Sequence, residues 1–276
     1  MTKHQETAVT TLDRLKLAAT LVEPEQATDQ AVVLVHGGGV TRQEGGFFTR
    51  LADGLAEAGV ASLRFDLRGH GQSEGRMEEL TLAAVLNDIR VALAQVREAT
   101  GAASVSLLGA SFGGGICAYY AAKRPAEVER LVLLNPQFNY KRRTIDNTPF
   151  WENDHLKPEA ATELDAQGYI AFNPNLRHGR AIFHEVFWFD LDSAIREIQA
   201  PTLLVHGTKD TLVPIASTLD ALPRFTAEHW LVTVEGSQHG FAVHDDPQYL
   251  NPQSQEWQAF VIRTVAEWLV PDAHNA

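Results

Sequence analysis

The feature that most constrains the fold of this chain is a repeated alternation between short apolar runs and longer segments of helical periodicity. The apolar runs are rich in Val, Ile and Leu, and polar residues do not alternate with them, as expected for strands covered on both faces. Such runs predict central parallel strands at residues 31–35, 60–65, 104–108, 131–134, 202–205 and 230–234.

Helical periodicity is clearest in residues 81–99, where apolar residues recur on one face. Thr81 is placed to cap the start of this helix, and Gly101 lies just past its end. Strands alternating with helices predict an α/β fold with a mostly parallel sheet and right-handed crossovers. Residues 8–12 and 15–22 predict an antiparallel hairpin at one edge. Further helices are predicted at residues 47–58, 114–123 and 257–269.

One long segment departs from this alternation. Residues from Pro136 to about Arg196 separate two predicted strands by far more than the ~10–15 residues of a crossover helix. The segment is also rich in aromatic side chains. We therefore expect a single domain over residues 1–276, with a cap inserted at approximately 136–196 and folded over the end of the sheet.

The charge and cysteine content exclude several classes of function. There are 23 Lys and Arg against 35 Asp and Glu, a net charge of −12, which disfavours binding to nucleic acid or to an anionic membrane. The single cysteine, Cys117, excludes an internal disulfide and a Cys-rich metal site. No apolar run approaches the ~18 residues of a membrane span, and the first residues do not resemble a secretion signal. We expect a soluble, cytoplasmic protein.

A candidate nucleophile is Ser111, within the sequence Gly-Ala-Ser-Phe-Gly that follows the predicted strand 104–108. A serine on a strand-to-helix turn has strained backbone angles in a tight space, so the positions two residues away need to be Gly or nearly so. The same spacing surrounds Ser73, but that serine follows a polar loop and precedes a charged segment. The context therefore favours Ser111.

A serine hydroxyl needs a base to remove its proton and a third group to orient that base. Asp210 comes just after the predicted strand 202–205, and His239 follows the predicted strand 230–234. The order Ser, Asp, His is the one expected for a nucleophile at such a turn, and all three follow strand ends. His244, beyond the Gly-Phe turn that follows His239, is the alternative base.

Backbone N–H groups that stabilise an oxyanion are expected at two places. One is the amide of Phe112, just after the nucleophile. The other lies in the Gly37-Gly38-Gly39 loop after the predicted strand 31–35, with Gly38 as our first choice and Gly39 as the alternative. A phosphate-binding loop is disfavoured because GxGxxG and a GK[ST] ending are both absent.

These residues together resemble the α/β-hydrolase superfamily over essentially the whole chain. The resemblance rests on His36-Gly37, the Asp-Leu-Arg-Gly-His-Gly-Gln-Ser loop at 66–73, the Ser111 turn, Asp210 and His239-Gly-Phe. Within the superfamily the chain is similar to bacterial feruloyl or cinnamoyl esterases, which also insert a cap. The resemblance implies an eight-stranded sheet, a Ser111–His239–Asp210 triad, no cofactor and no metal.

The resemblance also implies a small-molecule ester substrate with an aryl or medium-chain acyl group, cleaved through an acyl-enzyme on Ser111. We expect substrate contacts from Gly39 and from an apolar wall of Phe183, Phe187 and Trp188, side chains whose alternative role is the core of the cap. Gly38 stands where many such esterases carry a bulky residue, which predicts a roomier pocket.

Other functions use the same residues. A thioesterase or acyltransferase is one alternative, with Lys141-Arg142-Arg143 near the phosphates of coenzyme A. A carbon–carbon bond hydrolase, a lactonase and a non-catalytic small-molecule receptor are the others. The sequence leaves the oligomeric state open, a homodimer included.

Overall fold

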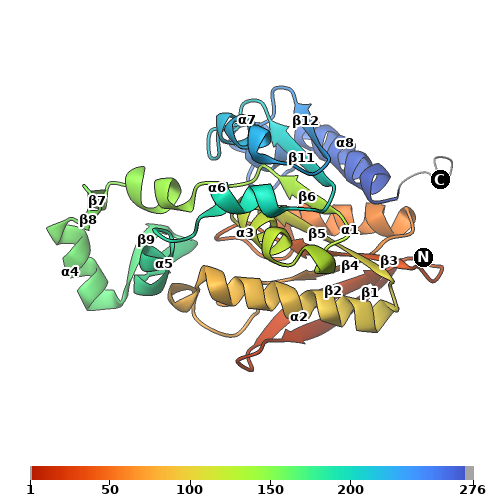
Figure 1. Ribbon diagram of the computed structural model, residues 1–276, viewed down its shortest axis with the longest axis horizontal. Helices are drawn as coiled ribbons and strands as arrows, with labels where there is room; N and C mark the ends of the chain where they lie inside the picture. The colour runs from red at the N-terminus through yellow and green to blue at the C-terminus, as the bar shows by residue number, and fades with distance from the viewer. Residues whose placement is uncertain (1, 271–276) are drawn as a thin grey trace.

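The computed structural model describes residues 2–270, in which helices pack on both sides of an eight-stranded sheet (Figure 1). The strand order is β1-β2-β4-β3-β5-β6-β11-β12, and all pairs from β4 to β12 are parallel. The predicted α/β class and the eight-stranded sheet are confirmed. The strands are β1 (Lys3–Thr10), β2 (Lys16–Glu23), β3 (Gln30–Val35), β4 (Ala61–Phe65), β5 (Ser104–Ala110), β6 (Leu131–Leu134), β11 (Thr202–Gly207) and β12 (His229–Val234).

The edge of the sheet is the antiparallel hairpin of β1 and β2, which was predicted from residues 8–22. β1 begins earlier than the apolar pattern indicated, because one of its faces is in solvent and the strand continues through polar residues to Lys3, whereas β2 has the predicted length. Arg14 sits in the turn with a φ of 74°.

The continuous apolar runs of the central strands arise because the sheet separates two hydrophobic cores. In β3, Val33 and Val35 belong to the core on one face, whereas Val32 and Leu34 belong to the core on the other. Helices α2 (Leu82–Thr100) and α3 (Ser111–Lys123) pack on the first face, and α1 (Phe47–Glu57) and α8 (Pro252–Leu269) pack on the second. Successive side chains of a strand point to opposite faces, so both must be apolar.

The ends of α2 follow the predicted capping residues. The Thr81 hydroxyl accepts a hydrogen bond from the Ala84 N–H at 3.0 Å, and Gly101 ends the helix with a φ of 71°. These contacts satisfy backbone groups that the helix itself leaves unpaired. No helix within residues 2–270 is long and apolar enough to cross a membrane.

Residues 136–196, here called the insertion, lie between β6 and β11 and extend beyond one end of the sheet, at the left of Figure 1. Their buried side chains, which include Ile170, Ile182 and Phe183, continue the hydrophobic core on the α2 and α3 face of the sheet. That the insertion acts as a cap stays a prediction at this stage. Its main elements are β7 (Trp151–Glu152), β8 (His155–Leu156), α4 (Pro158–Gln167), β9 (Tyr169–Asn173), β10 (Leu176–Gly179), α5 (Arg180–Glu185) and α6 (Leu191–Ala194).

The turn from β5 into α3 is tight because two glycines allow backbones to meet. A Cβ on Gly113 would lie 2.6 Å from the carbonyl oxygen of His36 and 2.8 Å from that of Val35. A Cβ on Gly109 would lie 2.6 Å from the carbonyl oxygen of Gly113. Ser111, between them, has a φ of 50°, in the left-handed region that side chains disfavour. The glycines let α3 begin directly against β3.

We predict that Gly113→Ala lowers the free energy of unfolding by about 3 kcal/mol, since its methyl group meets backbone atoms that cannot move aside. Gly101→Ala is the control, because a Cβ there meets nothing within 4 Å and only the positive φ is unfavourable. That change should cost about 1 kcal/mol. Urea unfolding measures both, and equal losses would contradict the packing argument.

Candidate active site

Ser111 opens into a cavity of about 330 Å³ at the end of the sheet. The floor comes from the sheet side, with Gly38 and Phe112 beside the serine. The insertion supplies much of the remaining wall, including Phe150, Phe172, Leu176 and His178. The cavity volume lies at the small end of the usual range for ligand sites.

Asp210 and His239, predicted from separate loops, are joined by a hydrogen bond of 2.6 Å between His239 Nδ1 and Asp210 Oδ2. A carboxylate only accepts, so the Nδ1 atom carries the hydrogen and Nε2 keeps a free lone pair. The Asp210 side chain is fully buried, while that of His239 is 24% exposed. This pairing fixes both the tautomer and the direction of the imidazole.

Asp210 is held by further donors that keep it ionised. Its Oδ1 atom accepts the N–H groups of Leu212 at 2.9 Å and Val213 at 2.8 Å. Burial acts to raise the pKa of Asp210, but hydrogen bonds from His206, His239 and the Val213 N–H outweigh it. The pKa of this carboxyl therefore lies below its ordinary value.

His206, in β11, was not predicted from the sequence as part of the site. Its Nε2 atom lies 2.8 Å from the carbonyl oxygen of Val213 and 3.5 Å from Asp210 Oδ2. Because the carbonyl only accepts, Nε2 donates, and Nδ1 accepts from the Thr218 hydroxyl at 2.8 Å. A signal was available in the sequence, since His206 follows the predicted strand 202–205 directly and lies four residues before Asp210.

Glu44 is a buried carboxyl group beside the glycine loop. Its Oε1 atom accepts the Gly37 N–H at 2.5 Å, and both Oε1 and Ser111 Oγ lie within 4 Å of where a Cβ on Gly37 would stand. Burial raises the pKa of Glu44, against the opposing effects of the Gly37 hydrogen bond and the charge of His239. Within residues 2–270, no direct hydrogen bond joins Ser111 to His239. No sequence motif indicated Glu44.

The three consecutive glycine amides of the loop after β3 have different partners. Gly37 donates to Glu44, and Gly39 donates to His70 Nε2 at 3.3 Å. The Gly38 N–H has no acceptor in the described part of the chain, and Gly38 lies in contact distance of Phe112. Phe112 is in the first turn of α3, where backbone N–H groups lack helical partners. Two residues whose amides have no acceptor in the described part of the chain thus line the cavity next to Ser111.

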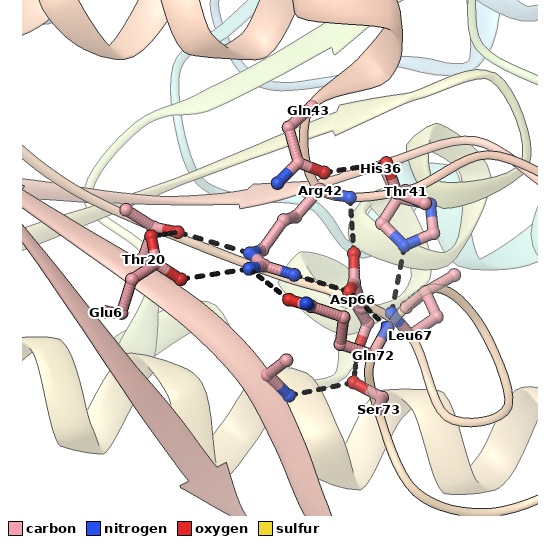
Figure 2. Close-up of polar contacts among 11 residues, drawn as sticks. Glu6, Thr20, His36, Thr41, Arg42, Gln43, Asp66, Leu67, Gln72 and Ser73 are labelled. Atoms are coloured by element: carbon pink, nitrogen blue, oxygen red, sulfur yellow. Dashed lines mark hydrogen bonds and ion pairs between the residues drawn. The ribbon is translucent and has the colours of Figure 1, made fainter.

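The glycine loop is anchored by a buried ion pair that Figure 2 shows. Arg42 donates to Asp66 through its guanidinium and its backbone N–H, at 2.6 Å each, and the guanidinium also reaches Glu6 at 2.9 Å and Gln72 at 2.8 Å. Asp66 follows β4, so the contact joins the loops after two neighbouring strands. An ion pair buried this completely holds its partners in one arrangement.

His36 supplies a second link between these loops. Its Nε2 atom accepts the Leu67 N–H at 2.9 Å (Figure 2). The Nδ1 atom therefore carries the hydrogen and donates to the Gly37 carbonyl at 2.7 Å. Burial, with a contribution from nearby His70, lowers the pKa of His36 to about 3. The ring is therefore neutral and able to accept.

Ser73, in the second Gly-x-Ser-x-Gly sequence, has a structural role. Its hydroxyl donates to the Asp66 carbonyl at 2.6 Å and accepts the Ala18 N–H at 2.9 Å (Figure 2). Both hydrogen-bonding roles of the hydroxyl are thus occupied by the backbone. This agrees with the choice of Ser111 over Ser73.

The residues expected to contact substrate do not line the Ser111 cavity. Gly39 borders a neighbouring hollow, and Trp188 is 87% exposed. Phe183 packs against Trp151 inside the insertion, with ring centroids 5.5 Å apart. Phe187 contacts the same indole and the ammonium of Lys141. The aromatic lining comes from other side chains, because α5 turns Phe183 inward.

The space predicted beside Gly38 is occupied by the insertion. A Cβ on Gly38 would lie 3.6 Å from Leu176 Cδ1, which is ordinary van der Waals contact. Leu176 thus fills the space that was expected to be open beside Gly38. Among residues 2–270, no group of three His, Cys, Asp or Glu side chains is arranged to hold a metal ion.

Comparison with known proteins gives the family. Residues 30–196, more than half of the chain, match the family described as alpha/beta hydrolase fold. A monoacylglycerol lipase of Mycolicibacterium smegmatis is 26% identical over 267 residues, which are 90% of each protein. The non-heme chloroperoxidase CPO-A1 of Kitasatospora aureofaciens is 27% identical over 225 residues, covering 68% of this chain and 78% of its own length.

Solved structures share the fold. Est1E from Butyrivibrio proteoclasticus, determined with bound ferulic acid, superposes with a TM-score of 0.75 at 20% sequence identity. The match covers 94% of this chain and 99% of that one. The resemblance inferred from the motifs is therefore confirmed at the level of the superfamily: the chain belongs to the alpha/beta hydrolase fold family and is an enzyme of that family.

Proposed function

We propose that this enzyme hydrolyses carboxylic esters of small molecules through an acyl-enzyme on Ser111. The observation that carries the proposal is the 2.6 Å hydrogen bond between His239 and Asp210, at the edge of the sheet where Ser111 opens into a cavity. A relative described as a monoacylglycerol lipase supports ester chemistry, and Est1E, which shares the fold, has been determined with bound ferulic acid.

In the proposed mechanism, the Ser111 hydroxyl attacks the ester carbonyl while His239 Nε2 accepts its proton. Asp210 is ionised and holds the Nδ1–H, so it stabilises the imidazolium that forms. His239 then gives the proton to the leaving alcohol. A water molecule, deprotonated by the same nitrogen, releases the acyl group and restores the serine.

The free amides of Gly38 and Phe112 stabilise the negative charge that develops on the carbonyl oxygen by donating hydrogen bonds to it. Each such donor typically contributes about 3–4 kcal/mol to the transition state. Gly37 and Gly39 are poor candidates because their N–H groups are already engaged by Glu44 and His70. This favours Gly38 over the alternative, Gly39.

We further propose that the insertion acts as a cap over the reacting ester. Phe150, Phe172 and Leu176 line the same cavity as Ser111 and present apolar surface. Such a wall suits an aryl or medium-chain acyl group, whose burial removes apolar surface from water. The cavity volume of about 330 Å³ favours small substrates.

The proposal predicts that Ser111→Ala lowers kcat for 4-nitrophenyl butyrate by at least ~10⁴-fold, because no other group forms the acyl-enzyme. Ser73→Ala is the matched control, from the same Gly-x-Ser-x-Gly spacing; it removes two hydrogen bonds to the backbone, so it should lower stability but reduce kcat by no more than about tenfold. A fluorophosphonate should label Ser111 stoichiometrically. Label on any other residue, or activity surviving in Ser111→Ala, would reject the mechanism.

A second prediction concerns Glu44 as a positioning residue for the glycine loop. Glu44→Ala removes the acceptor of the Gly37 N–H and should lower kcat/KM about tenfold, the equivalent of about 1.4 kcal/mol. Glu44→Gln keeps an acceptor oxygen and should recover to within about threefold of wild type. If Gln is as impaired as Ala, the charge of Glu44 matters and its hydrogen bond does not.

A further inference from the structure

The cavity at Ser111 contains a cation with no partner. Among its lining residues, Arg143 is formally charged and none is Asp or Glu, although the whole chain carries a net charge of −12. Arg143 is exposed, and no ion pair or side-chain hydrogen bond ties its guanidinium to another residue between 2 and 270. Its neighbour Lys141, by contrast, pairs with Asp146 and Asp154 at 2.7 Å each.

His178 is a second unsatisfied group in the same wall. Its side chain lies in β10, the residue is 8% exposed, and its Nδ1 atom is buried with no hydrogen-bond partner. The ring packs against Phe172, with centroids 4.5 Å apart. Burial lowers the pKa of His178 to about 4, and nearby His70 and Arg143 add to the effect. It is therefore neutral at pH 7 and has one N–H to donate.

These two groups point to one kind of ligand. Buried polar atoms in proteins are nearly always hydrogen-bonded, so an orphaned imidazole in a ligand cavity indicates a polar group brought by the ligand. A guanidinium is suited to pairing with the two oxygens of a carboxylate. A neutral imidazole adds an N–H donor without a second charge.

We propose that the natural substrate is an ester that also carries a free carboxylate, which binds to Arg143 and His178 while its ester carbonyl reaches Ser111. This inference rests on the proposed function, and it narrows the substrate class. The apolar side chains Phe150, Phe172 and Leu176 would then contact the hydrocarbon between the two ends.

A phosphate of coenzyme A is a poorer fit for the same cation. The pantetheine arm separates the thioester from the diphosphate by a long chain, whereas Arg143 and Ser111 line one cavity of about 330 Å³. Lys141, which an array of phosphates would also need, is already paired with two carboxylates. Because Arg143 and Ser111 line the same small cavity, a carboxylate on the acyl group itself is favoured.

The test compares two esters of the same shape, monoethyl adipate and ethyl 6-methylheptanoate, in which an isopropyl group replaces the carboxylate. Wild type should prefer the anionic ester in kcat/KM by at least ~10-fold, measured by acid release. Arg143→Gln should reduce this preference about 10–100-fold, and Arg143→Lys should keep part of it. His178→Phe keeps a ring without a donor and should reduce the preference several-fold.

Arg142→Gln is the matched control, because Arg142 borders only an adjoining cavity of about 170 Å³. It should retain the wild-type preference. Monoethyl esters of diacids from four to eight carbons test the spacing. A preference near unity across the series, or one that Arg143→Gln leaves unchanged, would overturn the proposal. The proposal would also be overturned if Arg143→Gln lowered kcat/KM for hexanoyl-coenzyme A as much as for monoethyl adipate. That result would show that Arg143 binds phosphate.

A protein that does not hydrolyse esters can still be tested for the carboxylate site by measuring binding. If wild type hydrolyses neither ester, calorimetry of monoethyl adipate with the Ser111→Ala protein measures binding without chemistry. Binding that is weakened at least tenfold by adding Arg143→Gln would support the carboxylate site even then. Absence of binding, or binding insensitive to Arg143, would reject it.

Discussion

The contact on which the site depends is between backbones, where Gly113 in the first turn of α3 meets the end of β3. With no side chain there, the helix begins against the carbonyl oxygens of Val35 and His36. The chain that leaves β3 at His36 is the glycine loop, so one contact sets the distance between Ser111 and the amide of Gly38. Any side chain at Gly113 would separate the nucleophile from the donors that stabilise its product.

Two carboxyl groups near His239 have their pKa values displaced in opposite directions. Asp210 is surrounded by donors and stays ionised, while burial raises the pKa of Glu44. A fixed negative charge thus stands at Nδ1 of the imidazole, where it stabilises the imidazolium of the proposed mechanism.

The sequence predicted what depends on local pattern. Continuous apolar runs identify strands buried on both faces, and Thr81 and Gly101 mark the ends of one helix. Because parallel strands carry loops to one edge, the positions of Ser111, Asp210 and His239 after strands were enough to expect them together. The hydrogen bond of Asp210 with His239 follows from that topology.

The cavity wall was not predictable in the same way, because it depends on how the insertion packs. Aromatic density indicated Phe183, Phe187 and Trp188, yet one lies inside the insertion and another is in solvent. Leu176 and His178 face Ser111 from far along the chain. Their roles come from tertiary contacts that leave no periodic or spacing signal.

The two Gly-x-Ser-x-Gly sequences show how one local pattern can serve a site in two ways. Around Ser111, glycines allow close backbone approach and expose the hydroxyl. Around Ser73, Gly71 has a φ of 51° and packs closely against the Asp66 carboxylate, and the Ser73 hydroxyl donates to the Asp66 carbonyl. Asp66 in turn holds Arg42, which follows the glycine loop. The second sequence therefore stabilises the loop that carries the Gly38 amide, and the first provides the serine that faces it.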